Sequence, residues 1–246
     1  AEQIQYFKVT QYFFFKQWTE LKNYANQKGI QIIGDMPIYV AADSVEVWTK
    51  PELFQLDEER NPLFVAGVPA DQFSATGQLW GNPLYAWEEH KKQGYAWWIH
   101  RIEESFKIYD VLRIDHFKGF SDYWQVDGKA EVAKDGSWQP GPGYDLFKAV
   151  KEQLGDLPII AEDLGNIDDK ARKLLTDCNY PGMKILQFGF EDVSGESLDS
   201  PHYCIPHSIV YTGTHDNDVT NGWYNSLTEQ QQQYINDYTH RHEDES

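Results

Sequence analysis

Three short apolar runs in this chain each end in an acidic residue, and they constrain its fold more than any other feature. The runs are VLRID, LPIIAE and IVYTGTHD, which end at Asp115, Glu162 and Asp216. Each is rich in Val, Ile, Leu or Tyr and is followed by turn-forming residues, as is typical of a buried parallel strand. The carboxyl ends of such strands are where α/β folds place their chemistry. The three carboxylates therefore predict one acidic, concave site suited to cationic charge or sugar hydroxyls.

The residues around these runs alternate between helical and extended patterns. Apolar residues recur at three- and four-residue steps over residues 11–28, which predicts an amphipathic helix that Gly29 ends. Further helices are predicted over residues 85–109, 144–155, 168–180 and 227–240. Parallel strands are predicted over residues 31–35, 111–115, 158–162, 183–188 and 209–214.

Two stretches interrupt this alternation. Residues 41–86 contain several prolines and glycines without strong periodicity, which predicts a functional insertion or lid inside an α/β domain. A second loop, rich in Gly and Trp, is predicted from residue 116 to about residue 143. Several aromatic residues lie among the turn-formers, where they are suited either to stack on sugar rings or to cover the core: Trp80, Tyr85, Trp124 and Trp138.

Five such strands fit either an open doubly wound sheet or part of a (β/α)8 barrel. The chain has no Gly-rich phosphate-binding loop, which weighs against a nucleotide-binding sheet. We therefore expect an α/β fold, a (β/α)8 TIM barrel present as an incomplete portion of about strands 3 to 7. Barrel portions over residues 1–40 and 87–246 would flank an inserted lid over residues 41–86.

An arc of five strands cannot close a barrel, and it leaves two unpaired strand edges. We expect the chain to be a portion of a longer protein, or to be completed by another chain. Expressed alone, it is expected to aggregate or to stay partly unfolded, because apolar surface left in water costs roughly 25 cal/mol per Å².

Composition excludes several classes of partner. The net charge is −18, which repels nucleic acid and anionic membranes. No apolar stretch approaches the roughly 20 residues of a membrane-spanning helix. Cys178 and Cys204 are too few for a disulfide framework and fit a reducing, cytoplasmic location.

Two strand ends suggest acid–base and nucleophilic chemistry. Arg113 and Asp115 share one face of their strand, so the arginine is expected to hold the aspartate ionised and to lower its pKa. A structural ion pair is the alternative. Glu162 lies among apolar residues, where its pKa can rise enough for a general acid. Its neighbour Asp163 is expected to cap the next helix or to lie in a turn, and His116 to anchor a loop.

A metal site is a competing interpretation of the same residues. No short, fixed spacing of zinc ligands occurs in the chain, and no catalytic metal is expected. The side chains that would serve a divalent ion are Asp115, His116, Glu162, His215 and Asp216.

Six segments carry a resemblance to a known family. The segments GDMPIYVAADSVEVW, GVPADQFSATGQLWGNPLYAW, VLRIDHFKGF, IIAEDLG, GMKILQFGF and THDND resemble, in this order, the 4-α-glucanotransferases, also called amylomaltases or disproportionating enzymes. This family belongs to the α-amylase clan, which shares the Asp and Glu strands, whereas the first two segments are specific to the amylomaltases.

The resemblance implies a (β/α)8 barrel and a retaining transfer of α-1,4-glucan segments, with no cofactor. Asp115 would be the nucleophile, Glu162 the general acid/base, and Asp216 the carboxylate that binds the 2- and 3-hydroxyls of the distorted sugar. The remaining residues implied by motif match are Asp35, Arg113 and His215 in the same subsite, and Asp71, Phe73, Gln78, Trp80 and Asn82 in the lid.

The partners implied are α-1,4-glucans and malto-oligosaccharides, with glucose as an acceptor, in a barrel completed by missing parts of the same protein. Family members are about twice as long as this chain. Two alternatives stay open at this stage: an α-amylase-type hydrolase of α-1,4-glucans, and an inactive glucan-binding fragment of such an enzyme.

Overall fold

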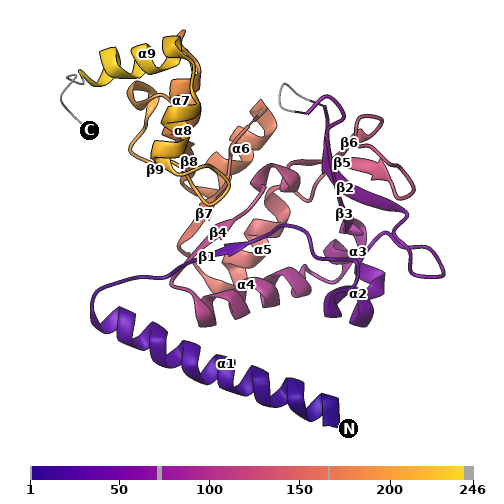
Figure 1. Cartoon of the computed structure of the whole chain (residues 1–246). Coiled ribbons are helices and arrows are strands. Elements are labelled where there is room, and N and C mark those ends of the chain that lie inside the picture. Colours follow the sequence, from indigo (N-terminus) through magenta and orange to yellow (C-terminus); the bar gives the residue numbers. More distant parts are fainter. Residues whose placement is uncertain (1, 71–73, 166, 241–246) are drawn as a thin grey trace. The chain divides into compact units, whose positions relative to one another are not determined.

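The computed structural model describes residues 2–70, 74–165 and 167–240. The chain forms two compact units, Ala1–Asn179 and Tyr180–Ser246 (Figure 1).

A three-stranded parallel sheet forms the centre of the first unit. Strand β4 (Val111–Ile114) lies between β1 (Ile33–Met36) and β7 (Ile159–Ala161), and both pairings are parallel. The side chains of Leu112 and Ile114 are fully buried. Because strands covered on both faces read as continuous apolar runs, the sequence prediction of parallel strands here is confirmed.

Three helices accompany this sheet: α4 (Ala96–Ile108), α5 (Tyr144–Leu154) and α6 (Asp169–Cys178). Helix α5 buries Leu146, Phe147 and Val150, which recur at helical spacing. Phe147 packs against Phe117 and Phe120, with ring centroids 5.1 Å apart in both pairs. Phe117 and Phe120 follow β4 closely in the chain, so their packing against α5 supports the segment after Asp115.

Helix α6 excludes one of the two roles expected for Asp163, that of the helix cap. The residue that caps it is Asp168, whose side chain accepts a hydrogen bond from the Ala171 backbone N–H, and not Asp163. Helices commonly begin at an Asp whose carboxylate accepts from the backbone N–H two or three residues on.

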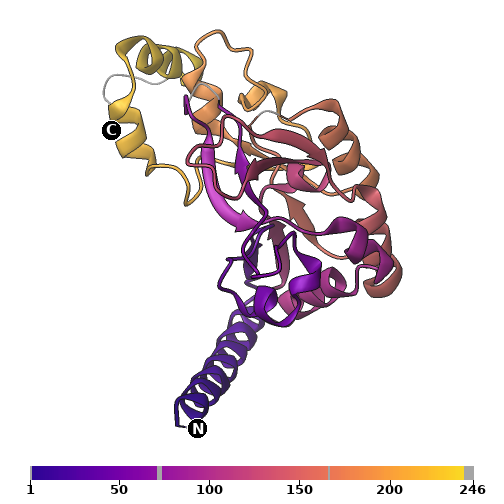
Figure 2. The ribbon, with the colours of Figure 1, turned by 90° about the vertical axis from the view of Figure 1, so that its right-hand side faces the viewer.

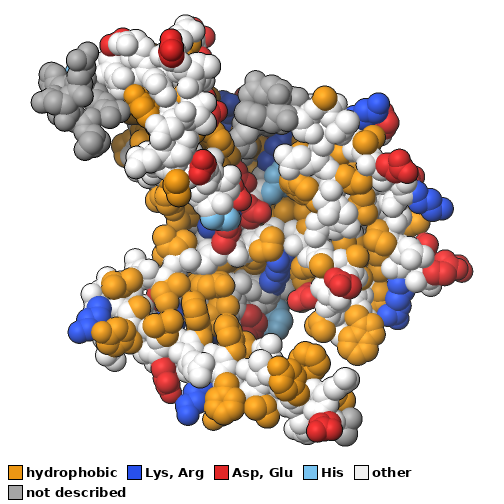
Figure 3. All heavy atoms as spheres, in the orientation of Figure 1, with side chains coloured by type: hydrophobic (Ala, Val, Ile, Leu, Met, Phe, Trp, Pro, Cys, Tyr) orange, Lys and Arg blue, Asp and Glu red, His pale blue; other side chains and the backbone are white. Residues whose placement is uncertain are grey.

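Helix α1 (Glu2–Gln27) begins nine residues before the predicted helix and buries none of its side chains. Its C-terminal half is held through Trp18 Nε1, which donates to the Ile108 carbonyl at 2.7 Å, and Lys22 Nζ, which donates to the Tyr109 carbonyl at 2.8 Å. Its N-terminal end lies away from the rest of this unit (Figure 2). Hydrophobic side chains line the helix (Figure 3), among them Ile4, Tyr6, Phe7, Val9, Tyr12, Phe13, Phe14 and Phe15.

A second sheet lies within the two stretches that were predicted to lack regular structure, so the prediction of irregular loops there was wrong, whereas the lid role of residues 41–86 stays a prediction. Its strands are β2 (Phe64–Val68), β3 (Gln78–Pro83), β5 (Asp122–Asp127) and β6 (Ser137–Pro140). They pair antiparallel in the order β3-β2-β5-β6. Short helices flank two of the strands. Helix α2 (Val45–Thr49) and the 3-10 helix η1 (Pro51–Leu53) precede β2, and the 3-10 helix η2 (Phe117–Phe120) follows β4.

The single helix predicted over residues 85–109 is instead two helices, α3 (Trp87–Lys92) and α4. Gly94 and Tyr95 both adopt positive φ angles, 61° and 59°, which end one helix before the next begins. Tyr85, considered above as a loop aromatic, is fully buried, and its hydroxyl donates to the Ile38 carbonyl at 2.7 Å.

The second unit contains a two-stranded parallel sheet of β8 (Gly182–Ile185) and β9 (Ser208–Tyr211). The strand predicted over residues 183–188 ends at Ile185, because α7 (Leu186–Glu191) follows it directly. The other elements are the 3-10 helix η3 (Pro201–Tyr203), α8 (Thr220–Ser226) and α9 (Glu229–Thr239). Among the helices described in either unit, none has the length and apolar character needed to cross a membrane.

Candidate active site

A buried arginine joins two carboxylates at the carboxyl end of the parallel sheet. Arg113 lies opposite Asp35 in the β1–β4 register. Its Nη1 donates to both carboxylate oxygens of Asp35 at 2.6 Å, and to Oδ1 of Asp115 at 3.0 Å. The arginine side chain is 9% exposed, whereas those of Asp35 and Asp115 are 37% and 42% exposed. The charge of the arginine is thus buried below two acidic groups that reach solvent.

This geometry bears out the sequence prediction that Arg113 and Asp115 share a strand face. Burial lowers the pKa of the Arg113 guanidinium, but its hydrogen bonds and ion pairs with Asp35 and Asp115 outweigh burial and raise that pKa above the ordinary value. A buried positive charge thus lies within hydrogen-bond distance of the Asp115 carboxylate.

Glu162 follows β7 and is half-buried. Its Oε1 accepts from the Leu164 backbone N–H and its Oε2 from the His116 backbone N–H, both at 2.8 Å. The pKa of Glu162 is raised to about 7, chiefly by burial and also by the negative charge of Asp115, while the two N–H donors and Arg113 oppose that rise. A carboxyl with a pKa near 7 can donate a proton and accept it back at neutral pH.

The backbone sets these carboxylates side by side. Asp115 donates its N–H to the Met36 carbonyl at 3.0 Å, and Glu162 donates its N–H to the Ile114 carbonyl at 3.0 Å. Each of these two acidic residues is therefore held to the neighbouring strand by its own backbone N–H, at the carboxyl end of the sheet. Because the strands are parallel, Asp35, Asp115 and Glu162 all lie at the same edge of the sheet, as predicted from the sequence.

Strand β3 contributes an indole to this edge. The rings of Trp80 and His116 meet edge to face with centroids 4.9 Å apart, and Trp80 Nε1 donates to Gln78 Oε1 at 3.2 Å. Burial, with the positive charge of Lys118, lowers the pKa of His116 to about 4, so this imidazole is neutral at pH 7. The Trp80 side chain stays 37% exposed. An aromatic ring with an open face next to carboxylates is suited to stack on a sugar.

Two of the other four predicted lid residues, Asn82 and Gln78, lie on β3. Asn82 is half-buried and its Nδ2 donates to the Val40 carbonyl at 3.0 Å, so it joins β3 to the segment after β1. Gln78 is exposed at the start of β3. Asp71 and Phe73 lie outside the described residues.

His215 and Asp216 belong to the second unit. Both side chains are exposed, at 69% and 65%, and His215 Nε2 lies 3.5 Å from Asp216 Oδ1. The turn before α8 is fixed by Asn217, whose Oδ1 accepts from the N–H and the hydroxyl of Thr214 at 2.9 and 3.1 Å. The grouping of Asp216 with Asp115 and Glu162 stays a prediction.

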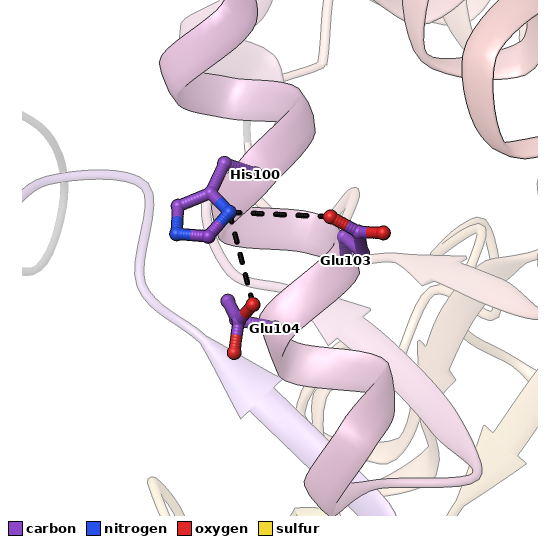
Figure 4. A group of neighbouring side chains, drawn as sticks. All are labelled: His100, Glu103 and Glu104. Carbon is purple, nitrogen blue, oxygen red and sulfur yellow. Dashed lines mark ion pairs between the residues drawn. The ribbon is translucent and has the colours of Figure 1, made fainter.

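The cation that pairs with both Asp35 and Asp115 is the guanidinium of Arg113. One group of three metal-ligating side chains occurs in the described part of the chain: His100, Glu103 and Glu104 on α4 (Figure 4). All three are exposed, and Lys107 Nζ already binds Glu104 at 2.5 Å. Residues three and four apart meet on any helix surface, so this group is an ordinary network of helix ion pairs.

Sequence reasoning missed one charged residue at this site. Lys118 is buried within η2 and forms ion pairs with Asp122 and Asp168 at 2.6 and 2.7 Å. A lysine between two buried phenylalanines in the run HFKGF was the available signal, because a lysine is almost never buried without a partner.

The sequence matches the 4-alpha-glucanotransferase family over residues 1–246. It is 53% identical to a 4-alpha-glucanotransferase of Streptococcus pneumoniae over 247 residues, 100% of this chain and 49% of that protein. It is 47% identical to the Thermus thermophilus 4-alpha-glucanotransferase over 97% of this chain and 48% of that protein. The chain thus spans about half the length of these curated relatives.

Solved structures give the same result. The amylomaltase of Streptococcus agalactiae, in complex with acarbose, matches with a TM-score of 0.97 and 61% identity over 100% of this chain and 50% of that one. The amylomaltase of Corynebacterium glutamicum matches with a TM-score of 0.73 at 18% identity, which bears on the fold alone.

Proposed function

The chain belongs to the 4-alpha-glucanotransferase family, and we propose from this premise that the whole protein transfers α-1,4-glucan segments between malto-oligosaccharides or starch-type glucans. The observation that carries the proposal is the pair at the sheet edge: Asp115, paired with a buried arginine, and Glu162, with a pKa near 7. Two carboxyls that differ in this way are what a retaining glycosyl transfer requires.

The reaction would proceed by double displacement. Asp115 attacks C1 of the donor sugar while Glu162 gives its proton to the glycosidic oxygen, so that the C1–O bond breaks and a glucosyl ester forms on Asp115. Glu162, now ionised, then takes the proton from the 4-hydroxyl of an acceptor glucan or glucose. That oxygen attacks C1, the ester bond breaks, and both carboxyls return to their first states.

The other predicted site residues would bind the sugar. Asp216 would accept hydrogen bonds from the 2- and 3-hydroxyls of the distorted ring, with His215 beside it, while Asp35 and Arg113 line the same subsite. Trp80 would cover the bound sugar. Its contact with His116, the residue after Asp115, supports this role. With Gln78, Asn82, Asp71 and Phe73, Trp80 would exclude water and so favour transfer over hydrolysis.

The architecture proposed for the whole protein is a (β/α)8 barrel. The parallel sheets β1-β4-β7 and β8-β9 would be about its strands 3 to 7, and the antiparallel sheet would form the lid region. The remaining strands and the acceptor subsites would come from other parts of the same protein. Both cysteines of the described structure are free, in keeping with the cytoplasmic location that we propose.

The test uses the full-length enzyme with maltotriose as donor, with and without added glucose. Transfer gives longer and shorter oligosaccharides without a net gain of reducing ends, whereas an α-amylase-type hydrolase would raise the number of reducing ends. The variant Glu162→Gln is expected to slow transfer by at least about 1000-fold while retaining glucan binding.

A matched control is Glu152→Gln, because Glu152 is an exposed glutamate of α5, 65% exposed, and its loss should not change the rate. A transfer rate of Glu162→Gln within a few-fold of the wild type would contradict the role of Glu162. If the wild type binds glucan without any turnover, the proposed transfer activity is contradicted and a glucan-binding function is supported instead.

A further inference from the structure

A buried ammonium group joins the segment after the proposed nucleophile to two neighbouring elements. Lys118 Nζ donates to Asp122 Oδ1 at the start of β5 and to Asp168 Oδ2 at the N-terminus of α6, at 2.6 and 2.7 Å. It also lies 4.5 Å from the ring centroid of Trp138 on β6. The lysine side chain is 10% exposed. One side chain therefore anchors η2 to β5 and α6 and also lies against the Trp138 ring of β6.

The burial of this charge depends on both of its carboxylates. Moving an ammonium group out of water is unfavourable unless opposite charge and hydrogen bonds replace the lost solvent. Burial raises the pKa of Asp168, but its hydrogen bonds with Lys118 and with the Ala171 N–H outweigh burial and lower that pKa to about 2. Asp168 is consequently ionised at neutral pH, where it pairs with the Lys118 ammonium group.

The same short helix fixes two backbone donors at Glu162. His116 caps the beginning of η2, and its N–H donates to Glu162 Oε2 at 2.8 Å. The next N–H, that of Phe117, donates to the Glu162 carbonyl oxygen at 3.1 Å. His116 has a φ of 50°, a conformation sparsely populated by residues other than glycine. Such a conformation persists only where the surrounding structure enforces it.

We propose that Lys118 is a positioning residue for the acid/base: by anchoring η2 to Asp122 and Asp168, it holds the His116 N–H against the Glu162 carboxylate. The inference rests on the proposed function, because it concerns how the acid/base of that reaction is held. Lys118 itself neither contacts the sugar nor moves a proton.

The consequence is a measurable change in the ionisation of Glu162. The charged groups acting on this carboxyl are Asp115 and Arg113 from β4, while the nearby His116 is neutral. The hydrogen bond from the His116 N–H stabilises the ionised carboxylate of Glu162. A looser η2 would lengthen this bond and so weaken that stabilisation. The protonated form of Glu162 would then persist to higher pH, by about 0.5 to 1 pH unit for one weakened hydrogen bond.

A charge effect and a positioning effect make opposite predictions for one variant. Asp122→Asn removes a negative charge near the site, which by electrostatics alone would lower the pH at which Glu162 ionises. Removing the same carboxylate also releases one side of the Lys118 anchor, which would raise that pH. Lys118→Met raises it on either account, and Lys118→Arg keeps the charge and much of the anchor.

The experiment measures kcat and KM for maltotriose transfer across pH with full-length Lys118→Met, Lys118→Arg and Asp122→Asn, at temperatures where all are folded. The matched control is Lys91→Met, which removes an exposed ion pair with Asp145 of the same 2.7 Å length. We expect kcat of Lys118→Met to fall about tenfold or more with KM little changed. In the basic limb of the pH profile, kcat falls as Glu162 ionises. We expect the pH of this fall to be higher in Lys118→Met and Asp122→Asn than in the wild type, and closer to the wild-type value in Lys118→Arg.

A downward shift of the basic limb in Asp122→Asn, or unchanged kcat and pH profiles in all three variants, would overturn the proposal. If Lys118→Met does not fold, the conservative variants Asp122→Asn and Lys118→Arg still decide it. Failure of the proposed function is a separate result: the wild-type enzyme would then carry out no glucan transfer, or Glu162→Gln would leave the rate unchanged.

Discussion

The backbone N–H of His116 donates to Oε2 of Glu162 across 2.8 Å, so the residue that follows the proposed nucleophile holds the proposed acid/base. The Glu162 side chain, after β7, is thereby bonded to the backbone of the segment that follows β4. The position of the segment after β4 therefore sets how the Glu162 carboxyl lies relative to Asp115.

The first prediction concerns the pH dependence of the rate. Glu162 must be protonated to donate to the leaving oxygen, and its pKa is raised to about 7, chiefly by burial. Activity should therefore be full below this value and should fall as pH rises through about 7. The measurement is kcat/KM of the full-length enzyme from pH 5 to pH 9. A rate that stays flat to pH 9 would contradict Glu162 as the proton donor.

The second prediction applies the same shift to stability. The ordinary pKa of a glutamate is 4.5, and that of folded Glu162 is about 7. Between these values the unfolded chain has lost the proton that the folded chain retains, so this contribution to stability is complete below pH 4.5 and is lost as pH rises through 7. The loss amounts to at most about 3 kcal/mol.

Urea unfolding of the wild type and of Glu162→Gln at pH 4.5 and pH 8 checks this linkage. The variant has no titrating group at the position, so its stability relative to the wild type should improve on going from the lower to the higher pH. Glu152→Gln serves as the control, and its effect should be the same at both pH values. An improvement of equal size in both variants would show that burial of Glu162 is not its cause.

The third prediction is for Arg113, whose guanidinium bonds Asp35 and Asp115. Arg113→Met leaves two carboxylates facing each other without a cation, and because both reach solvent we expect a loss of about 1–3 kcal/mol in the free energy of unfolding. We also expect kcat to fall at least about 100-fold. Arg113→Lys should recover part of the stability but little of the rate, because an ammonium group does not reproduce the geometry of the guanidinium. Equal kcat in wild type and Arg113→Met would refute this role.

The parallel strands β4 and β7 and their acidic ends were predictable because burial on both faces leaves a clear apolar run in the sequence. The antiparallel sheet was not, because two of its strands, β2 and β3, contain glycines that read as turns. A Cβ on Gly67 would lie 2.4 Å from the Gln78 carbonyl oxygen of the neighbouring strand. That glycine is there because β2 and β3 approach closely, and a close approach and a turn leave the same mark in a sequence.

The site shows the same division. The pairing of Arg113 with Asp115 follows from the two-residue period of a strand, and the raised pKa of Glu162 follows from its apolar neighbours. The donors to Glu162 are backbone N–H groups of His116 and Leu164, which any residue but proline supplies. The sequence carries no specific signal for them. Likewise, the apolar run after Met183 continues into α7, and a short apolar run does not distinguish a strand from a buried helix.

The fourth prediction is that glucan transfer needs no metal ion. Covalent and acid–base chemistry by two carboxyls accounts for both steps, and the carboxylates Asp35 and Asp115 already have Arg113 as their cation. Activity of the full-length enzyme should survive exhaustive treatment with EDTA followed by buffer exchange. Loss of activity that an added divalent ion restores would support the metal site instead.

The last prediction concerns the choice between sugar and water as acceptor. Trp80 contacts His116, the residue after Asp115, with ring centroids 4.9 Å apart, and its side chain is partly exposed. Trp80→Ala would open the site around the glucosyl ester to solvent, so hydrolysis should rise relative to transfer, by about tenfold if water gains free access. Trp80→Phe keeps an aromatic ring and should stay near the wild type. The ratio is measured as new reducing ends per transferred glucosyl unit in maltotriose reactions. A ratio unchanged in Trp80→Ala, with transfer still active, would mean that Trp80 does not shield the intermediate from water.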